Sequence, residues 1–161
     1  MHERQREPYE VAIAEAWHQV DIYHGADRFL RTFGGLDPIV GAVFAANFCQ
    51  SEVRNGGLHQ FFSNPTGVLA PEALAAFRAM ALLDAAQAVE EAMFYFGTPY
   101  PREIQERQVR LAAVPGKSRA EWDPFYNLDP RFYGALRGPG DSDRFVEAAN
   151  SFVAPQSGRA R

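Results

Sequence analysis

The stretch of sequence that decides the fold runs Glu52-Val53-Arg54-Asn55-Gly56-Gly57-Leu58-His59-Gln60-Phe61-Phe62-Ser63-Asn64-Pro65-Thr66-Gly67. An apolar helical pattern runs into Asn-Gly-Gly, restarts as a short aromatic segment and stops again at Asn-Pro-Thr-Gly. Because Asn and Gly enter left-handed backbone conformations at low cost, the triplet predicts a helix end followed by a sharp reversal. Two helix ends only about ten residues apart predict a tight, broken-helix corner at Asn55–Gly57.

Helical periodicity extends from this corner in both directions, and caps and breakers divide it into segments. Asp37 and Asp84 each stand before an apolar helical pattern and are expected to act as N-caps. No credible alternation of period two is present, so the spacing predicts no strand. The expected helices cover residues 8–33 with an interruption at Gly25, 38–55, 58–63, 71–80, 85–96, 102–113 and about 142–152.

The sequence therefore predicts an all-α protein, a single compact domain of six or seven helices over residues 8–153. The charged segment 102–113 has few apolar residues and is expected to lie at the surface. Residues 114–140 contain many Pro and Gly breakers and are expected to form a long irregular loop with short helical turns. Residues 1–7 and 154–161 are expected to be flexible termini.

Composition supports one domain with a substantial core. The chain has 161 residues, of which 47% are apolar, and 13 Phe stand against 2 Trp, which predicts a phenylalanine-rich interior. The only cysteine, Cys49, excludes an internal disulfide and every multi-cysteine metal site. Because it lies in an apolar run, a buried and inert thiol is expected.

The charge is mildly acidic, with 20 acidic and 16 basic side chains. Residues 1–100 hold 12 acids and 6 bases, a net charge of −6, whereas residues 101–161 hold 8 acids and 10 bases, a net charge of +2. This balance argues against direct nucleic-acid binding, which needs a basic patch. No apolar run is long enough to span a membrane and the charged start lacks a signal core, so a soluble, cytoplasmic protein is expected.

Five polar residues of the central block stand in an otherwise apolar neighbourhood, and two interpretations apply to them. In the first, they line a binding or catalytic pocket at the corner. In the second, which we favour, they satisfy the backbone groups freed where the helices end, with the two asparagines as caps. A left-handed Gly56 would then reject any β-branched side chain. The candidate residues are Glu52, Asn55, His59, Gln60 and Asn64.

No catalytic or metal-ligating constellation appears. The four histidines, His2, His18, His24 and His59, do not have the spacing of a metal site, and no Gly-rich phosphate loop follows a strand. Cys49 has no neighbouring base, and the Ser motifs of hydrolases are missing. We therefore assign no catalytic residue, no metal and no cofactor, and expect a protein that is not an enzyme.

The central block resembles the characteristic motif of a bacterial family of DNA-mimic-protein-like domains of unknown function. That motif runs from an acidic residue through Asn-Gly-Gly and Gln to two aromatics, an Asn and a Gly. The likeness covers roughly residues 38–153, with the helical pair 71–96, the Asp-x-x-Phe-Tyr at 129–133 and a closing amphipathic helix as weaker features. The matching residues are Glu52, Asn55, Gly56, Gly57, Leu58, Gln60, Phe61, Phe62, Asn64 and Gly67.

The resemblance implies an all-helical unit, often dimeric, without known enzymatic activity. It also implies a protein partner. In the DNA-mimic case, that partner is a DNA-binding protein, and acidic side chains of this chain occupy its DNA-binding site at the positions of phosphates. Such mimicry needs dense negative charge, and this chain has only a mild acid excess. Protein binding is the first hypothesis, and a small-ligand binder or enzyme at the corner is the alternative. The acidic candidates for a mimic surface are Asp21, Asp27, Asp37, Asp84, Glu90 and Glu91.

Overall fold

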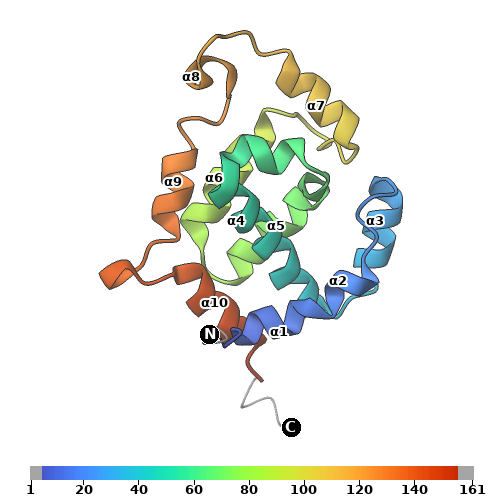
Figure 1. Cartoon of the computed structure of the whole chain (residues 1–161), viewed down its shortest axis with the longest axis vertical. Coiled ribbons are helices and arrows are strands. Elements are labelled where there is room, and N and C mark those ends of the chain that lie inside the picture. The colour runs from blue at the N-terminus through green and yellow to red at the C-terminus, as the bar shows by residue number, and fades with distance from the viewer. Residues whose placement is uncertain (1–4, 156–161) are drawn as a thin grey trace.

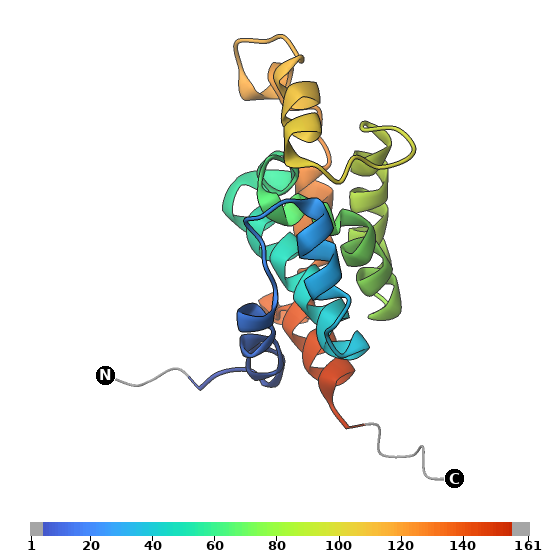
Figure 2. The ribbon, with the colours of Figure 1, turned by 90° about the vertical axis from the view of Figure 1, so that its right-hand side faces the viewer.

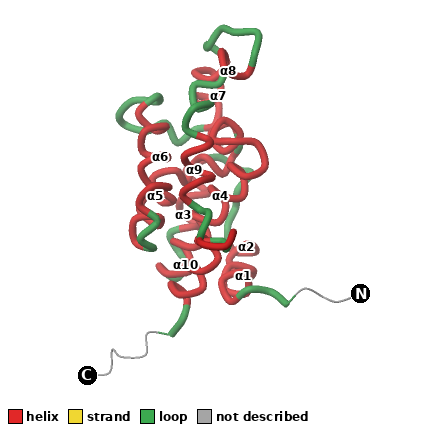
Figure 3. The backbone as a smooth tube through the Cα atoms, turned by 90° about the vertical axis from the view of Figure 1, so that its left-hand side faces the viewer, coloured by secondary structure: helices red, strands yellow, loops and turns green. Residues whose placement is uncertain are grey.

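The structure is a computed structural model that describes residues 5–155, and over this range the fold is all-α, as predicted. Ten α-helices and two 3₁₀ helices occur in these residues, and Figure 3 shows loops but no strand between them. The elements in chain order are α1 (Pro8–Ala14), α2 (Ala16–Gln19), α3 (Ala26–Phe33), α4 (Pro38–Ser63), η1 (Pro65–Leu69), α5 (Ala70–Ala79), α6 (Leu83–Phe94), α7 (Ile104–Ala112), α8 (Arg119–Trp122), α9 (Asp129–Ala135), η2 (Pro139–Asp141) and α10 (Arg144–Val153).

Helix α4 is the centre of the fold, and the other helices surround it in Figure 1. It begins where the sequence predicts, because the Asp37 carboxylate accepts from the backbone N–H groups of Ile39 and Val40. Most of its apolar side chains are fully buried, as is the free thiol of Cys49, whose pKa is raised by burial. The predicted central helix and the predicted burial of the Cys49 thiol are confirmed.

The predicted corner is present inside α4, but the left-handed residue is Gly57 and not Gly56. Gly57 has φ +81° and ψ 176°, whereas Gly56 has φ −152° and ψ 18°. The assignment of Gly56 as left-handed was therefore wrong by one position. Both glycines depart from helical dihedral angles, but only Gly57 has the positive φ that favours glycine.

Seven of the remaining α-helices form three groups around α4. Helices α5, α6 and α9 pack against one another, and α5 lies directly on α4. At one end, α1 lies beside α10, where the Tyr9 and Phe145 rings meet at 5.5 Å. At the opposite end, α7 and α8 project beyond the rest of the molecule (Figure 2). The core is rich in phenylalanine, as predicted, and its fully buried rings include Phe44, Phe62 and Phe125.

Three other boundaries differ from the predictions. The first predicted helix is divided into α1, α2 and α3, with extended backbone at Val20 and a left-handed Gly25. Asp84 is not the N-cap of α6, because α6 starts one residue earlier at Leu83. The segment 114–140 is more ordered than expected, since Asp129-Pro130 opens α9 instead of ending a helix. Proline in the first turn lacks only an N–H that would be unpaired anyway.

The expected flexible termini extend outside the described residues, at 1–4 and 156–161. Next to them, Glu7 caps α1 and accepts from the Asn150 side chain of α10 at 2.8 Å. The closing helix α10 is capped by Asp143, whose carboxylate accepts from the N–H groups of Phe145 and Val146. The same carboxylate forms a two-pronged ion pair with Arg54 of α4. Among the described residues, no helix has the length and apolar character needed to cross a bilayer.

Helix α7 departs most from the expected surface segment, because Arg107 is fully buried. Its guanidinium donates to the carbonyl oxygens of Phe62 at 2.9 Å and Asn64 at 3.0 Å, at the end of α4. It also donates to the carbonyls of Pro101 and Arg102. The cation thus meets the negative end of the α4 dipole and satisfies carbonyls that the helix leaves unpaired. Burial lowers the pKa of Arg107.

We predict that Arg107→Lys lowers the free energy of unfolding by roughly 2–4 kcal/mol, because a single ammonium cannot reach carbonyls on both sides of the cage and each lost buried partner costs about 1–3 kcal/mol. Chemical denaturation followed by circular dichroism measures the loss. Arg137→Lys, at a largely exposed side chain on the η2 turn, is the matched control and should leave stability unchanged. Equal stabilities for the two variants would contradict the assigned role.

Candidate functional site

The first polar network at the corner centres on the Glu52 carboxylate. Gln60 Nε2 donates to one of its oxygens at 2.6 Å, and Asn64 Nδ2 donates to the same oxygen at 2.9 Å. The Thr66 hydroxyl donates to the other oxygen at 3.4 Å. These partners lie 8 to 14 residues further along the chain, so Glu52 links the helix before the corner to the helix end after it. Three of the five candidate residues therefore bind one another.

The other two candidates are placed differently. Asn55 is exposed, and among residues 5–155 its side chain has no hydrogen-bond partner, so the expected cap at this position is not formed. His59 is half-buried; its Nδ1 lies 3.2 Å from the Ser63 hydroxyl, and its ring meets Trp122 at 5.0 Å. Burial lowers the pKa of His59. The structure thus brings His59 into contact with α8 and leaves Asn55 in solvent.

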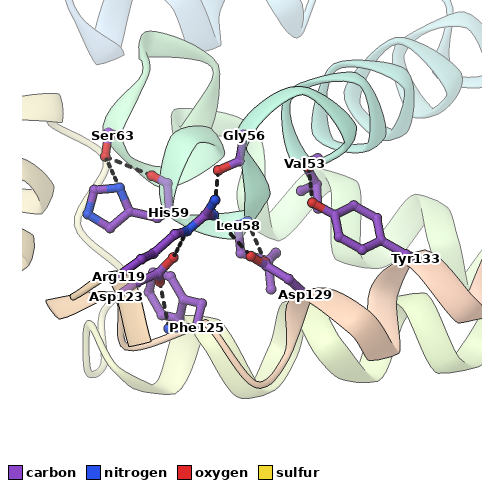
Figure 4. Close-up of polar contacts among 10 residues, drawn as sticks. All are labelled: Val53, Gly56, Leu58, His59, Ser63, Arg119, Asp123, Phe125, Asp129 and Tyr133. Carbon is purple, nitrogen blue, oxygen red and sulfur yellow. Dashed lines mark hydrogen bonds and ion pairs between the residues drawn. The ribbon is translucent and has the colours of Figure 1, made fainter. Parts of the chain in front are cut away.

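A second network, which we call the corner clamp, consists of Arg119, Asp123 and Asp129 (Figure 4). The N–H of Leu58, freed by the reversal, donates to Asp129 at 2.8 Å. Arg119 donates to the carbonyl of Gly56 at 3.0 Å and to Asp129 at 3.2 Å. The clamp therefore supplies a partner to the backbone on both sides of Gly57.

The clamp is itself held in a buried environment. The Asp123 side chain has no exposed surface and accepts from Arg119 Nε at 3.2 Å and from the Phe125 N–H at 2.9 Å. Asp129 is only 8% exposed, and this burial raises its pKa, against the lowering effects of the Leu58 N–H and Arg119. One arginine shared by two buried carboxylates thus fixes α8 and α9 against the corner.

Sequence reasoning missed this clamp. The Asp129-Pro130 pair was classed with the breakers, although Pro in a first helical turn was an available signal for a helix start. Tyr133, whose hydroxyl donates to the Val53 carbonyl at 2.8 Å, was noted only as part of a weak motif. The residues that complete the corner lie more than 60 positions beyond it, and nothing in the local pattern connects them.

The six acidic candidates come from several elements. Asp37 is occupied by its role as the cap of α4. Asp27 and Asp84 are exposed, on α3 and α6. The other three form salt bridges with arginines: Asp21 with Arg28 at 2.7 Å, Glu90 with Arg78 at 2.7 Å and Glu91 with Arg131 at 2.6 Å.

A surface groove of about 790 Å³ is lined by residues of the α5–α6 turn and of α10, and by none of the corner residues 52–67. Its lining includes the apolar side chains of Met80, Leu83 and Phe152. Leu83 is 62% exposed, which is unusual for an aliphatic side chain of this size. Three charged side chains also line the groove, Asp84, Arg144 and Glu147. Within residues 5–155, none of these three forms a salt bridge.

The fold and the corner define a helical domain in which one kinked central helix is held by later segments of the chain. The family model described as DMP19-like protein matches residues 34–150, which is most of the chain, and the chain belongs to this DNA-mimic-like family. The family recognised from the central block is thereby confirmed. No curated protein and no solved structure matches the chain.

We predict that Gly57→Ala lowers the free energy of unfolding by at least about 2 kcal/mol, because the left-handed backbone alone costs about 1–2 kcal/mol and the added methyl would overlap Asp129 and Arg119. Gly134→Ala in α9 is the matched control, since a methyl there meets no atom within 4 Å. Thermal unfolding of both variants measures the difference. A Gly57→Ala variant as stable as the control would show that the clamp does not need this close approach.

The pH dependence of Asp129 gives a further prediction. Because its folded pKa is raised above the ordinary 3.8, the folded protein keeps a proton that the unfolded chain has already lost. The stability linked to this proton is present below about pH 3.8 and is lost as the pH rises through the folded pKa. Carboxyl NMR titration should give a pKa above 3.8, and Arg119→Met should raise it further. A pKa below 3.8 would contradict this account.

Proposed function

We propose that this chain is a non-enzymatic protein-binding domain, and that the groove between the α5–α6 turn and α10 is its binding surface. The observation that carries the proposal is the coincidence of accessible apolar side chains with charged groups that lack salt-bridge partners. Protein interfaces combine an apolar centre with a polar rim in this way. The groove brings the exposed apolar side chain of Leu83 together with the charged side chains of Asp84 and Glu147, which fits that composition.

The contacts at the corner support a structural role for the motif residues. Glu52, Gln60 and Asn64 are bonded to one another, and a carboxylate already holding two amide donors is poorly suited to act as a general base. Gly56 and Leu58 have their free backbone groups bound by the clamp. These interactions favour a structural role for the Glu52 network and the corner clamp, with the protein partner bound at the groove.

DNA mimicry is the finer form of this proposal, and it rests on family membership. In that form, the partner is a basic DNA-binding protein, and Asp84 and Glu147 receive its cationic side chains. The arginine pairing of Asp21, Glu90 and Glu91 leaves few carboxylates free for a double row, so we favour a mixed apolar and acidic contact. The dimer that the resemblance implies and the cytoplasmic location both stay predictions.

The proposal predicts that Leu83→Asp abolishes partner capture. Val109→Asp is the matched control, because Val109 is 71% exposed on α7, outside the groove. Immobilised wild-type and variant proteins are exposed to an extract of the native host, and retained proteins are identified by mass spectrometry. We expect partners on the wild type and on Val109→Asp that are missing from Leu83→Asp. Equal retention by all three proteins would contradict the assigned surface.

The captured partner then separates DNA mimicry from general protein binding. The double variant Asp84→Asn, Glu147→Gln should weaken binding strongly at low salt and little at high salt, because exposed charges are screened within about 10 Å at 0.1 M. A mimic is displaced from its partner by duplex DNA. A partner that duplex DNA does not displace would support protein binding without mimicry.

A further inference from the structure

We propose that the hollow beside His59 and Trp122 is a binding site for a small planar aromatic molecule that carries one hydrogen-bond donor. The hollow has a volume of about 300 Å³. Such a volume is at the small end of known ligand sites and suits a molecule of one or two rings. Its wall combines polar and apolar side chains from α4, α7, the loop after α7 and α8, namely His59, Ser63, Gln108, Leu111, Val114 and Trp122.

The hydrogen bonds of Ser63 define what the histidine offers to a ligand. The Ser63 hydroxyl donates to the His59 carbonyl at 2.7 Å, and a hydroxyl has only one proton to donate. Its contact with His59 Nδ1 at 3.2 Å is then a hydrogen bond only if the ring nitrogen carries the proton. Nε2 of the neutral ring is therefore the acceptor, and Figure 4 shows it pointing away from Arg119.

The surroundings of the acceptor favour a flat apolar ligand. Trp122 stands nearly perpendicular to the His59 ring, with an interplanar angle of 78°, so a ring entering the hollow meets an aromatic wall. Leu111 and Val114 add aliphatic surface on the α7 side. Gln108 is held in place by donating to the Ser63 carbonyl at 2.9 Å. Stacking and burial supply affinity, and the single N–H···Nε2 hydrogen bond supplies selectivity.

This site is independent of the proposed protein-binding groove. The hollow belongs to the end of the molecule formed by α7 and α8, whereas the groove runs along α10 near the opposite end (Figure 2). No residue lines both. Failure of either proposal therefore leaves the other unaffected.

The test uses indole and benzofuran as probes, since they have the same shape but only indole has an N–H donor. The chain has two tryptophans, and their indole N–H signals in an ¹H–¹⁵N spectrum report on Trp122 in the hollow and on Trp17 outside it. We expect indole to shift the Trp122 signal saturably and to leave Trp17 unchanged. Benzofuran should bind about fivefold more weakly, the factor that one net hydrogen bond of about 1 kcal/mol represents.

Two variants test the role of the histidine. His59→Phe keeps an aromatic ring without an acceptor, so it should bind the two probes equally. Ser63→Ala removes the partner that fixes the tautomer and should reduce the preference for indole, which provides a second test if His59→Phe does not fold. An unchanged preference for indole in either folded variant, or no saturable shift of the wild-type Trp122 signal, would overturn the proposal.

Acidification gives an independent readout. Protonated His59 has a donor at Nε2, so the indole preference should disappear as the pH falls through the pKa of His59. Burial places this pKa below 6.5; nearby Arg119 lowers it further, while Asp123 and Asp129 oppose that effect. A preference for indole that persists below the pKa of His59, measured by NMR titration of its ring, would contradict the assigned acceptor.

Discussion

The kink in the central helix α4 frees backbone groups from their helical partners, and those that are buried need partners elsewhere in the fold. Leaving such a group unpaired costs about 1–3 kcal/mol. In this chain the reversal at Gly57 frees the Leu58 N–H and the Gly56 carbonyl, which bind Asp129 and Arg119. The end of the same helix frees the Phe62 carbonyl, which binds Arg107. Helices α7, α8 and α9 carry the side chains that bind these freed backbone groups, namely Arg107, Arg119 and Asp129.

The local parts of this arrangement could be predicted from sequence. Asn-Gly-Gly gave the corner, and Asp37 gave the start of α4, because both effects act over only a few residues. The error of one residue at Gly56 shows the limit of such reasoning, since either glycine can accept the left-handed conformation. The prediction of Asp84 as a cap was wrong because α6 already starts at Leu83, an apolar residue. The side chain of Leu83 is mostly exposed.

The distant parts could not be predicted in the same way. Arg107 looks like any arginine on a charged surface helix, and only the approach of α7 to the end of α4 makes it a buried carbonyl ligand. The same is true of Asp129, whose partner is 71 residues away. Within the candidate site, only the Glu52 network could be predicted from sequence, because Glu52, Gln60 and Asn64 lie in one short segment. The groove and the hollow depend on how helices meet, which sequence periodicity does not report.

The corner clamp has a consequence for the order in which the protein can assemble. During synthesis the central block, residues 52–67, is made well before Arg119 and Asp129. The backbone at Gly56–Gly57 therefore first lacks its hydrogen-bond partners. Contacts of such long sequence separation form late, because the intervening chain must first give up its freedom. The backbone groups at Gly56–Gly57 of the nascent α4 therefore remain hydrogen-bonded to water until the last third of the chain has been synthesised. A chain that stalls or ends before Arg119 and Asp129 lacks the partners of the kink in α4. Such a product would expose the central helix with unpaired backbone groups at its bend.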